Sequence, residues 1–172
     1  MGFPVTPPSP EPDRDEGPIE SILPVQSHPG SSIDGVQTNG VHHIGLAVID
    51  LDEAVETYAR LFGGTLEHRA VVPDQGVEAA SVLVGASRIE LLAPTGEDTP
   101  VGRFLARRGP GVHHIAYEVD DVAAALDDLA ARGAELIDTV PRRGLFGLQV
   151  AFVHPDAVHG VLTEVVSVAR LT

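Results

Sequence analysis

The sequence contains no cysteine and no lysine, because all 11 of its basic residues are arginine. The lack of cysteine excludes disulfide bridges, thiolate nucleophiles and sulfur-ligated metals. The lack of lysine excludes Schiff-base chemistry through a lysine amine and the phosphate-binding loop that requires one. No apolar run approaches the length of a membrane span, and no basic segment followed by an apolar one stands at the amino terminus. We therefore expect a cytoplasmic protein with no membrane partner.

Positive charge is scarce as well, and the formal net charge is −14. A nucleic-acid partner is not expected, since a phosphate backbone requires a basic face. A charge of this size acts first on solubility, and a local group of arginines can still bind a small anion.

Proline is concentrated at the start of the chain. Residues 1–40 carry eight of the 14 prolines, together with several acidic residues and few strong hydrophobes. Such a segment cannot bury enough apolar surface to offset the entropy lost on ordering, so we predict a disordered tail over 1–40. The remaining residues, 41–170, are enough for a single domain with its own core.

An internal repeat organises this domain. Val41–Val48 returns as Val112–Val119, an offset of 71 residues, and the similarity continues through Asp50 and Asp121. A shared period over about 25 positions indicates a duplicated supersecondary unit.

Each copy predicts the same order of elements, βαβββ, and hence an α+β fold of two paired modules, at about 41–95 and 112–170. In the first module the predicted elements are strands at 41–48, 65–72, 77–84 and 88–92 with a helix ending at Gly63-Gly64. In the second they are strands at 112–119, 134–140, 148–154 and 161–168 with a helix over 122–132. A short helix at 98–108 connects the modules.

The repeat also pairs residues that can bind a metal ion. Side chains alternate faces along a strand, so only one histidine of each His-His pair is expected to face a common site. His43 and His114 share a face with small residues, which leaves room for an ion. Each module's last strand adds a glutamate, Glu90 or Glu164, which is costly in an apolar strand unless it is paired or metal-bound.

Two imidazoles and two carboxylates without sulfur suit one divalent ion, with Co²⁺ expected first and Mn²⁺, Ni²⁺, Zn²⁺ or Fe²⁺ as alternatives. Four protein ligands on an octahedral ion leave two positions for an oxygen substrate. Such an ion acts as a Lewis acid toward the enolate that forms when a proton leaves the carbon next to a carbonyl.

Longer stretches of the sequence extend this pattern. They include His43–Val48, Gln75-Gly76-Val77, Ile89–Leu92, Glu97–Pro100, His113–Ala116, Phe152–Pro155 and Gly160–Glu164. Through them, residues 41–168 resemble the vicinal oxygen chelate (glyoxalase-like) superfamily and, within it, the methylmalonyl-CoA epimerase family. The Glu-Asp-Thr-Pro helix and the closing His-Pro and Gly-Val-Leu-Thr-Glu segments are the specific part of the resemblance.

The resemblance implies His43, Glu90, His114 and Glu164 as metal ligands and an acyl-CoA substrate. It implies an isomerase that interconverts the 2R and 2S forms of methylmalonyl-CoA by removing the C2 proton through a metal-stabilised enolate. It also implies a homodimer.

Inversion at a carbon needs an acid and a base on opposite faces, and the resemblance gives Glu164 one of these roles. For the other role, some family members have a glutamate where this chain has Ala79. Glu78, Gln75 or a metal-bound water are the candidates that remain, although Glu78 would face the site only at a β-bulge.

Substrate contacts follow less directly from the sequence. Many family members have lysine and serine where this chain has Asp156 and Ala157. Arg142 and Arg143 can supply phosphate contacts instead, because a guanidinium binds phosphate through two hydrogen bonds. Arginines 103, 107 and 108 are interpreted as the outer face of the connecting helix, and His154 and His159 as structural residues.

Other functions on the same fold remain open. A glyoxalase-type isomerase or lyase uses the same four ligands on a different substrate. An extradiol dioxygenase needs two histidines and one glutamate, which would make Glu90 surplus. A metal-free binding or resistance module needs none of them. The fold alone does not separate these functions.

Overall fold

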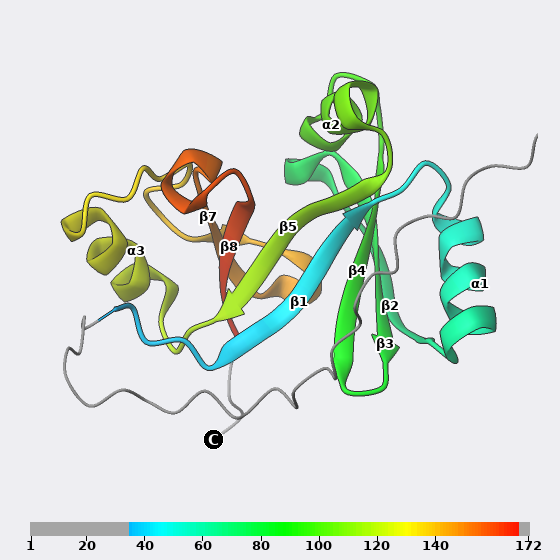
Figure 1. The fold of residues 1–172 in the computed structure, drawn as a ribbon, viewed down its shortest axis with the longest axis horizontal. Helices are drawn as coiled ribbons and strands as arrows, with labels where there is room; N and C mark the ends of the chain where they lie inside the picture. Colours follow the sequence, from blue (N-terminus) through cyan, green and yellow to red (C-terminus); the bar gives the residue numbers. More distant parts are fainter. Residues whose placement is uncertain (1–34, 169–172) are drawn as a thin grey trace, which may run out of the picture. The chain divides into compact units, whose positions relative to one another are not determined.

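The computed structural model describes residues 35–168, in which eight strands form one mixed sheet (Figure 1). The strand order is β2-β3-β4-β1-β5-β8-β7-β6. The strands are β1 Gly40–Ala47, β2 Thr65–Val72, β3 Val77–Val84, β4 Ser87–Pro94, β5 Gly111–Glu118, β6 Arg142–Arg143, β7 Gln149–Val153 and β8 Leu162–Ser167. The α-helices are α1 Leu51–Phe62, α2 Pro100–Arg108 and α3 Val122–Ala131, and short 3-10 turns lie at Pro73–Gln75, Leu145–Gly147 and Pro155–Val158.

The predicted duplication is confirmed by the sheet topology. In the first module β1 pairs in parallel with β4, and in the second β5 pairs in parallel with β8. The two modules meet where β1 and β5 pair antiparallel at the middle of the sheet. The four central strands are therefore related by an approximate twofold axis, as expected for a βαβββ repeat.

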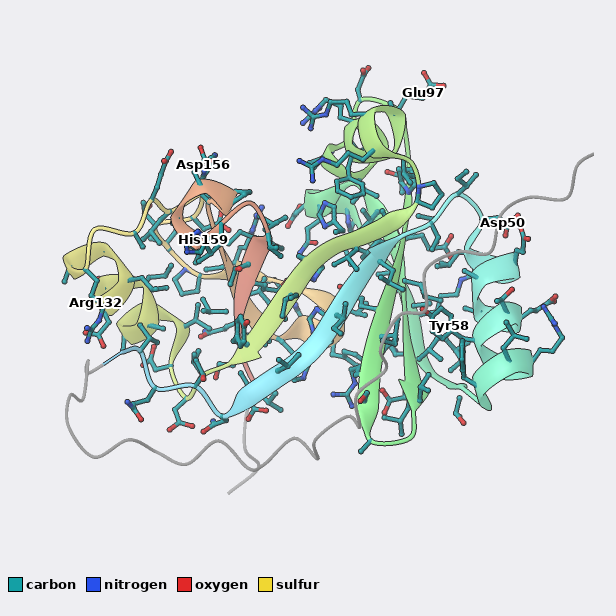
Figure 2. All side chains as sticks on the ribbon, in the orientation of Figure 1. Asp50, Tyr58, Glu97, Arg132, Asp156 and His159 are labelled. Carbon is teal, nitrogen blue, oxygen red and sulfur yellow. The ribbon has the colours of Figure 1, made fainter. Side chains whose placement is uncertain are left out.

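Helices α1 and α3 cover the outer faces of the two modules and begin in the same way. The Asp50 carboxylate accepts a hydrogen bond from the Glu53 amide, and the Asp121 carboxylate accepts one from the Ala124 amide. These are N-caps that satisfy amides without partners in the first helical turn. Figure 2 shows Tyr58 pointing from α1 toward the strands, where it packs against a buried cluster formed by Leu51, Ala80, Val82 and Leu91.

The alternation of side chains leaves the other face of the sheet for a site. On β3 and β4, Ala80 and Leu91 pack under α1, while Ala79 and Leu92 belong to a separate cluster on the opposite face. On β8, Val165 packs under α3, and the neighbouring Glu164 is buried on the inner face. Each strand thus supplies an apolar face to a helix and a mixed face to the interior.

The third strand predicted in the second module, at 134–140, is absent from the described structure. Only an isolated bridge between Leu136 and Val153 forms there, and the two-residue strand β6 follows. The Asp138 carboxylate accepts the Phe152 amide hydrogen at 2.8 Å. The Phe152 amide therefore donates to a side chain, whereas in a regular β-ladder it would donate to a backbone carbonyl oxygen. In addition, Pro141 has no amide hydrogen with which to continue the pairing.

The ordered contacts begin slightly before the predicted boundary at residue 41. The Asn39 amide donates to the Glu118 carbonyl oxygen, and Val36 packs against the core beneath α3. Most of the predicted tail, residues 1–34, lies outside the described residues. Among the helices over 35–168, none combines the length and the apolar character needed to cross a membrane.

Candidate metal centre

Two rows of side chains cross the four central strands and face the interior. In one row Gly45 of β1 pairs with Glu90 of β4 on one side and with His114 of β5 on the other. In the second row Ala116 of β5 pairs with His43 of β1 and with Glu164 of β8. Each row therefore has a small residue at its centre, an imidazole on one side and a carboxylate on the other.

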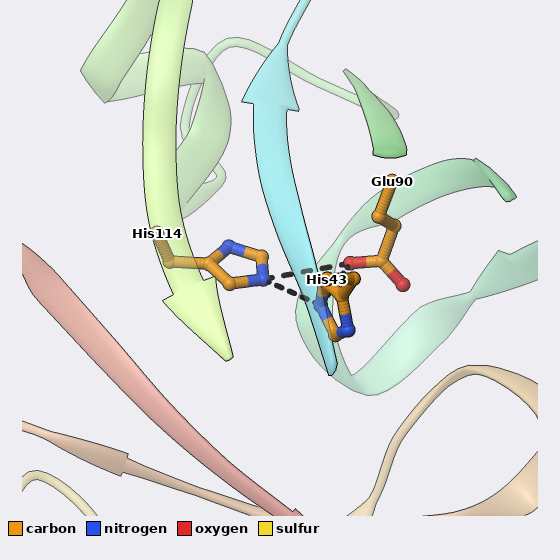
Figure 3. Close-up of side chains that lie close together, drawn as sticks. All are labelled: His43, Glu90 and His114. Atoms are coloured by element: carbon orange, nitrogen blue, oxygen red, sulfur yellow. Dashed lines mark hydrogen bonds and ion pairs between the residues drawn. The ribbon is translucent and has the colours of Figure 1, made fainter. Parts of the chain in front are cut away.

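The donor atoms of His43, Glu90 and His114 converge at one point (Figure 3). His43 Nε2 lies 3.0 Å from His114 Nε2 and 3.4 Å from Glu90 Oε2, and His114 Nε2 lies 3.6 Å from Glu90 Oε2. Glu164 lies beside this group, with Oε2 3.6 Å from His114 Nε2.

These separations fit a divalent ion. With bonds of about 2.1 Å, two ligand atoms on adjacent positions stand about 3.0 Å apart around an octahedral ion and about 3.4 Å apart around a tetrahedral one. Nitrogen and carboxylate oxygen without sulfur are also the donors that first-row divalent ions accept. The residues present therefore fit a metal centre.

Burial sets the protonation of these groups in the metal-free protein. Desolvation lowers the pKa of His114 to about 3, although the Glu90 charge opposes the shift, so the imidazole is neutral and keeps a lone pair for an ion. Burial raises the pKa of Glu90, but the hydrogen bond and charge of His43, together with the neighbouring His114 and His42, outweigh it and lower this pKa. Burial, reinforced by the Glu90 charge, raises the pKa of Glu164 well above its usual range.

The first histidine of each His-His pair contacts the Nδ1 atom of the second. The strict alternation assumed from the sequence fails here, because His42 on β1 and His113 on β5 each lie at a register shift, a β-bulge, in the β1–β5 ladder. His42 Nδ1 lies 2.8 Å from His43 Nδ1, and His113 Nδ1 lies 3.1 Å from His114 Nδ1. One histidine thus holds the outer nitrogen of the other and leaves its Nε2 for the centre. The repeated His-His pair was the sequence signal for this role.

Two hollows adjoin the centre. A narrow one lies between the ligands and an apolar wall of Ala79, Leu92 and Leu145, with Gln75 at its edge. A larger cavity, of about 260 Å³, opens beside His114 and is also bordered by Gln75. A small acyl group beside the ligands and a longer chain in the larger cavity are compatible with these dimensions.

Comparisons with known proteins agree with this geometry. The sequence model of the glyoxalase/bleomycin resistance protein/dioxygenase superfamily matches residues 42–152. An ethylmalonyl-CoA/methylmalonyl-CoA epimerase of Cereibacter sphaeroides is 36% identical over 72% of this chain and 94% of its own. The crystal structure of methylmalonyl-CoA epimerase from Mycobacterium tuberculosis superposes with a TM-score of 0.76 at 36% identity, over 78% of this chain and 91% of that one. The chain belongs to the methylmalonyl-CoA epimerase family.

Another structure of this family, described as methylmalonyl-CoA epimerase in complex with methylmalonyl-CoA and NH4+, is 41% identical. It superposes with a TM-score of 0.76 over 78% of this chain and 98% of that one. The resemblance stated from the sequence motifs is thereby confirmed.

Glu78, a candidate acid or base by sequence, is not brought to the centre. The β3–β4 ladder runs in unbroken register through Glu78 and Ala79, so no bulge turns Glu78 inward. Its carboxylate instead accepts a hydrogen bond from Arg69 Nε at 2.7 Å. Ala79, at the position where some family members have glutamate, is buried and faces the site.

The two arginines proposed for substrate contacts separate in the structure. Arg142 borders the larger cavity, pairs with Asp138 at 3.0 Å and lies over the Phe152 ring at 4.9 Å. Its Nε is buried and has no hydrogen-bond partner among the described residues. Arg143 is exposed and borders a different hollow, next to Phe146.

The sequence departs from the family at the turn Pro155–Val158 between β7 and β8. Asp156 and His159 stand on this turn, labelled in Figure 2, and both are exposed. The His154 ring accepts a hydrogen bond from the Asp156 amide, a local contact within the turn. These contacts agree with the structural interpretation of His154.

Proposed function

We propose that this chain is an isomerase that interconverts the 2R and 2S forms of methylmalonyl-CoA by removing and returning the C2 proton. The observation that carries the proposal is the convergence of His43, Glu90 and His114 beside the buried Glu164. It occurs in a chain that is 41% identical, over 78% of its length, to an epimerase that binds methylmalonyl-CoA.

Three residues, His43, Glu90 and His114, would hold the metal, with Glu164 as a fourth ligand. A divalent ion bound there supplies a Lewis acid that stabilises the negative charge arising on the thioester carbonyl oxygen. The donor set suits Co²⁺, which we propose as the resident ion.

Glu164 is the proposed proton carrier on one face of C2. In the metal-free protein burial, reinforced by the Glu90 charge, raises the pKa of Glu164, so this carboxylate is the more basic of the two at the site. Glu164 Oε2 lies 3.6 Å from His114 Nε2, which supports a role for this carboxyl group beside the metal site.

Arg142 and Gln75 are the proposed contacts to the acyl group. Arg142 borders the cavity beside His114, and its buried Nε has no hydrogen-bond partner among the described residues. A carboxylate is the natural acceptor for it, and the malonyl group carries a free one. Gln75 borders both hollows, so its amide can contact the thioester.

The opposite face of C2 lies against the apolar wall of Ala79, Leu92 and Leu145. Among the described residues of this wall there is no carboxylate. We assign the second proton transfer to a water molecule next to Gln75 rather than to Glu78, whose carboxylate is paired with Arg69.

Proton NMR of methylmalonyl-CoA in D2O tests the function. We expect loss of the C2 proton signal and conversion between the epimers with the Co²⁺-loaded protein, neither after chelation, and both again after Co²⁺ is restored. A metal-loaded protein that leaves the C2 proton at the background exchange rate contradicts the proposal.

Two further predictions accompany this function. A homodimer is supported by exposed apolar side chains at the end of α1 and on the edge strand β2, namely Leu61, Phe62 and Leu66. Sedimentation equilibrium would measure its mass, and a Phe62→Asp variant is expected to be monomeric. A cytoplasmic location remains a prediction that fractionation of the source cells would test.

A further inference from the structure

The β6–β7 hairpin reaches from one end of the sheet to the other. Strands β2 and β6 are the two edge strands of the described sheet. The turn of the hairpin, Leu145–Gly147, nevertheless contacts β2. This turn separates the narrow hollow beside the ligands from a more open one of about 450 Å³, because Val72, Gly144, Leu145 and Phe146 border both.

Two neighbouring residues of the turn have different surroundings. Leu145 is buried and packs in the cluster that contains Ala79 and Leu92, the apolar wall opposite the ligands. Phe146 is 46% exposed, and its ring stacks on the ring of His68 in β2, with centroids 4.5 Å apart and planes at 29°. The turn therefore supplies one side chain to the wall of the site and the next one to a contact with the far strand.

A β-bulge in β2 directs His68 toward the site. The β2–β3 ladder shifts register between Leu66 and His68, and His68 pairs with Ser81. Paired residues of neighbouring strands lie on the same face, and Ser81 is buried beside the narrow hollow. The bulge thus places the His68 ring where the turn can contact it.

Side-chain packing alone joins the turn to β2. The hydrogen bonds of the turn stay within the hairpin: the Gly144 amide donates to the Leu148 carbonyl oxygen at 2.9 Å, and the Gly147 amide donates to the Gly144 carbonyl oxygen at 3.1 Å. Within residues 35–168, no hydrogen bond or ion pair connects residues 144–148 to β2. The Phe146–His68 stack and the packing of Leu145 are therefore what hold the turn in place.

The backbone of Phe146 also depends on these contacts. Its φ of 58° and ψ of 5° lie in the left-handed region, which is unfavourable for a bulky side chain. Such a conformation persists where the surrounding structure enforces it. The stack on His68 supplies a contact of this kind.

We propose that His68 and Phe146 are positioning residues, whose stack holds Leu145 in the wall opposite the metal ligands and so fixes the space for the alkyl group on C2. Ala79 and Leu92 of the same wall stand within strands β3 and β4, whereas Leu145 stands on a turn. The inference rests on the proposed function for the identity of the substrate, but the positioning of Leu145 rests on the contacts of the turn alone.

Two acyl-CoA substrates that differ by one methylene measure the space beside Leu145. For His68→Ala and Phe146→Ala, we expect kcat/KM for ethylmalonyl-CoA relative to methylmalonyl-CoA to rise about 2–12-fold, the factor that corresponds to the interaction of one aromatic pair. His68→Phe keeps a ring for the stack and should leave this ratio as in the unmodified protein. Phe146→Gly relieves the left-handed backbone but also removes the ring, so it should raise the ratio as Phe146→Ala does.

A double variant distinguishes positioning from a general effect on the fold. Adding His68→Ala to Leu145→Ala should produce no further rise in the ratio, since the side chain that the stack holds is already absent. Ile49→Ala, which removes an exposed side chain that borders neither hollow, should leave the ratio unchanged. A further rise in the double variant, an equal rise in Ile49→Ala, or an unchanged ratio in Phe146→Gly overturns the proposal.

Amide hydrogen exchange tests the contact without any substrate. In His68→Ala, the Gly147 amide should exchange about 2–12-fold faster than in the unmodified protein, while the amides of α3 keep their rates. If this exchange accelerates but the protein has no epimerase activity, the positioning of Leu145 stands and the reaction is another one. If epimerisation is normal and neither the exchange nor the substrate ratio changes in His68→Ala, the positioning role is refuted and the proposed function stands.

Discussion

The imidazole of His114 lies directly over the α-carbon of Gly45 on the neighbouring strand. A β-carbon on residue 45 would stand 2.2 Å from His114 Cε1 and 2.4 Å from its Nδ1. Real β-carbons do not approach other atoms this closely, so the absence of a side chain at Gly45 is what allows His114 to reach the centre. The small residue in each row across the sheet is part of the site even though it supplies no ligand.

The substitution Gly45→Ala is therefore expected to displace His114 and to weaken Co²⁺ binding by about tenfold or more. Isothermal titration of chelated protein with Co²⁺ measures this, and circular dichroism shows that the fold persists. Gly96→Ala is the matched control, because a β-carbon there meets nothing closer than 4.0 Å. Equal Co²⁺ affinity in the two variants would contradict the role given to Gly45.

His113 is expected to orient His114 through the 3.1 Å contact between their Nδ1 atoms. His113→Phe keeps an aromatic ring against Phe104 but removes the nitrogen, and loss of such an outer contact typically costs about 10–100-fold in metal affinity. His113→Asn, which keeps a polar atom near the same place, should restore part of the affinity. A purely structural role would predict the reverse order, with phenylalanine tolerated better than asparagine.

Glu164 and Glu78 provide a direct comparison of two carboxylates. Glu164→Gln should lower the epimerisation rate by about 10²–10⁴-fold, the range typical for loss of a general acid or base. Glu78→Gln should leave kcat unchanged, since its carboxylate pairs with Arg69 and lies outside the site. Exchange of the C2 proton, followed by NMR, measures both variants. A large loss of activity in Glu78→Gln would contradict this prediction and would show that Glu78 takes part in catalysis.

Leu145 is expected to limit the size of the alkyl group on C2. It is buried in the wall opposite the ligands, and Leu145→Ala would enlarge the space there. One methylene in an apolar pocket changes specificity by about 10–200-fold, so kcat/KM for ethylmalonyl-CoA relative to methylmalonyl-CoA should rise about tenfold or more. Leu126→Ala, which removes a buried leucine of α3, is the control for general destabilisation, which is about 2–5 kcal/mol for such changes. A rise of the same size in this control would argue against a specificity role for Leu145.

The sequence predicted the grouping of His43, Glu90 and His114 that the structure brings together. The 71-residue repeat relates His43 to His114, and alternation along the strands selects these two from their His-His pairs. Glu90 and Glu164 were predicted because each is an acid inside an apolar strand. The roles of His42 and His113 were not predictable in this way, because a bulge in the β1–β5 ladder suspends the alternation at both places.

Some features of the structure depend on tertiary contacts and could not be predicted from local sequence patterns. The expected strand at 134–140 was wrong, since the Asp138 side chain takes the Phe152 amide that a ladder would use. Arg142 and Arg143 are adjacent in sequence, yet they border different hollows. The arginines of α2 line a groove only because the segment before β8 lies opposite them, a contact between distant parts of the chain.

The two rows across the sheet also have a mechanical consequence. Each module supplies one imidazole and one carboxylate, and within residues 35–168 the sheet joins the modules only where β1 pairs with β5. An ion bound by all four groups would link the two modules across the β1–β5 pairing. Its full binding free energy is available only while β1 and β5 stay paired, so the ion would stabilise this pairing. Loading the ion would then make the two modules open as one cooperative unit, and amide hydrogen exchange along β1 and β5 would slow more than exchange in α1 or α3.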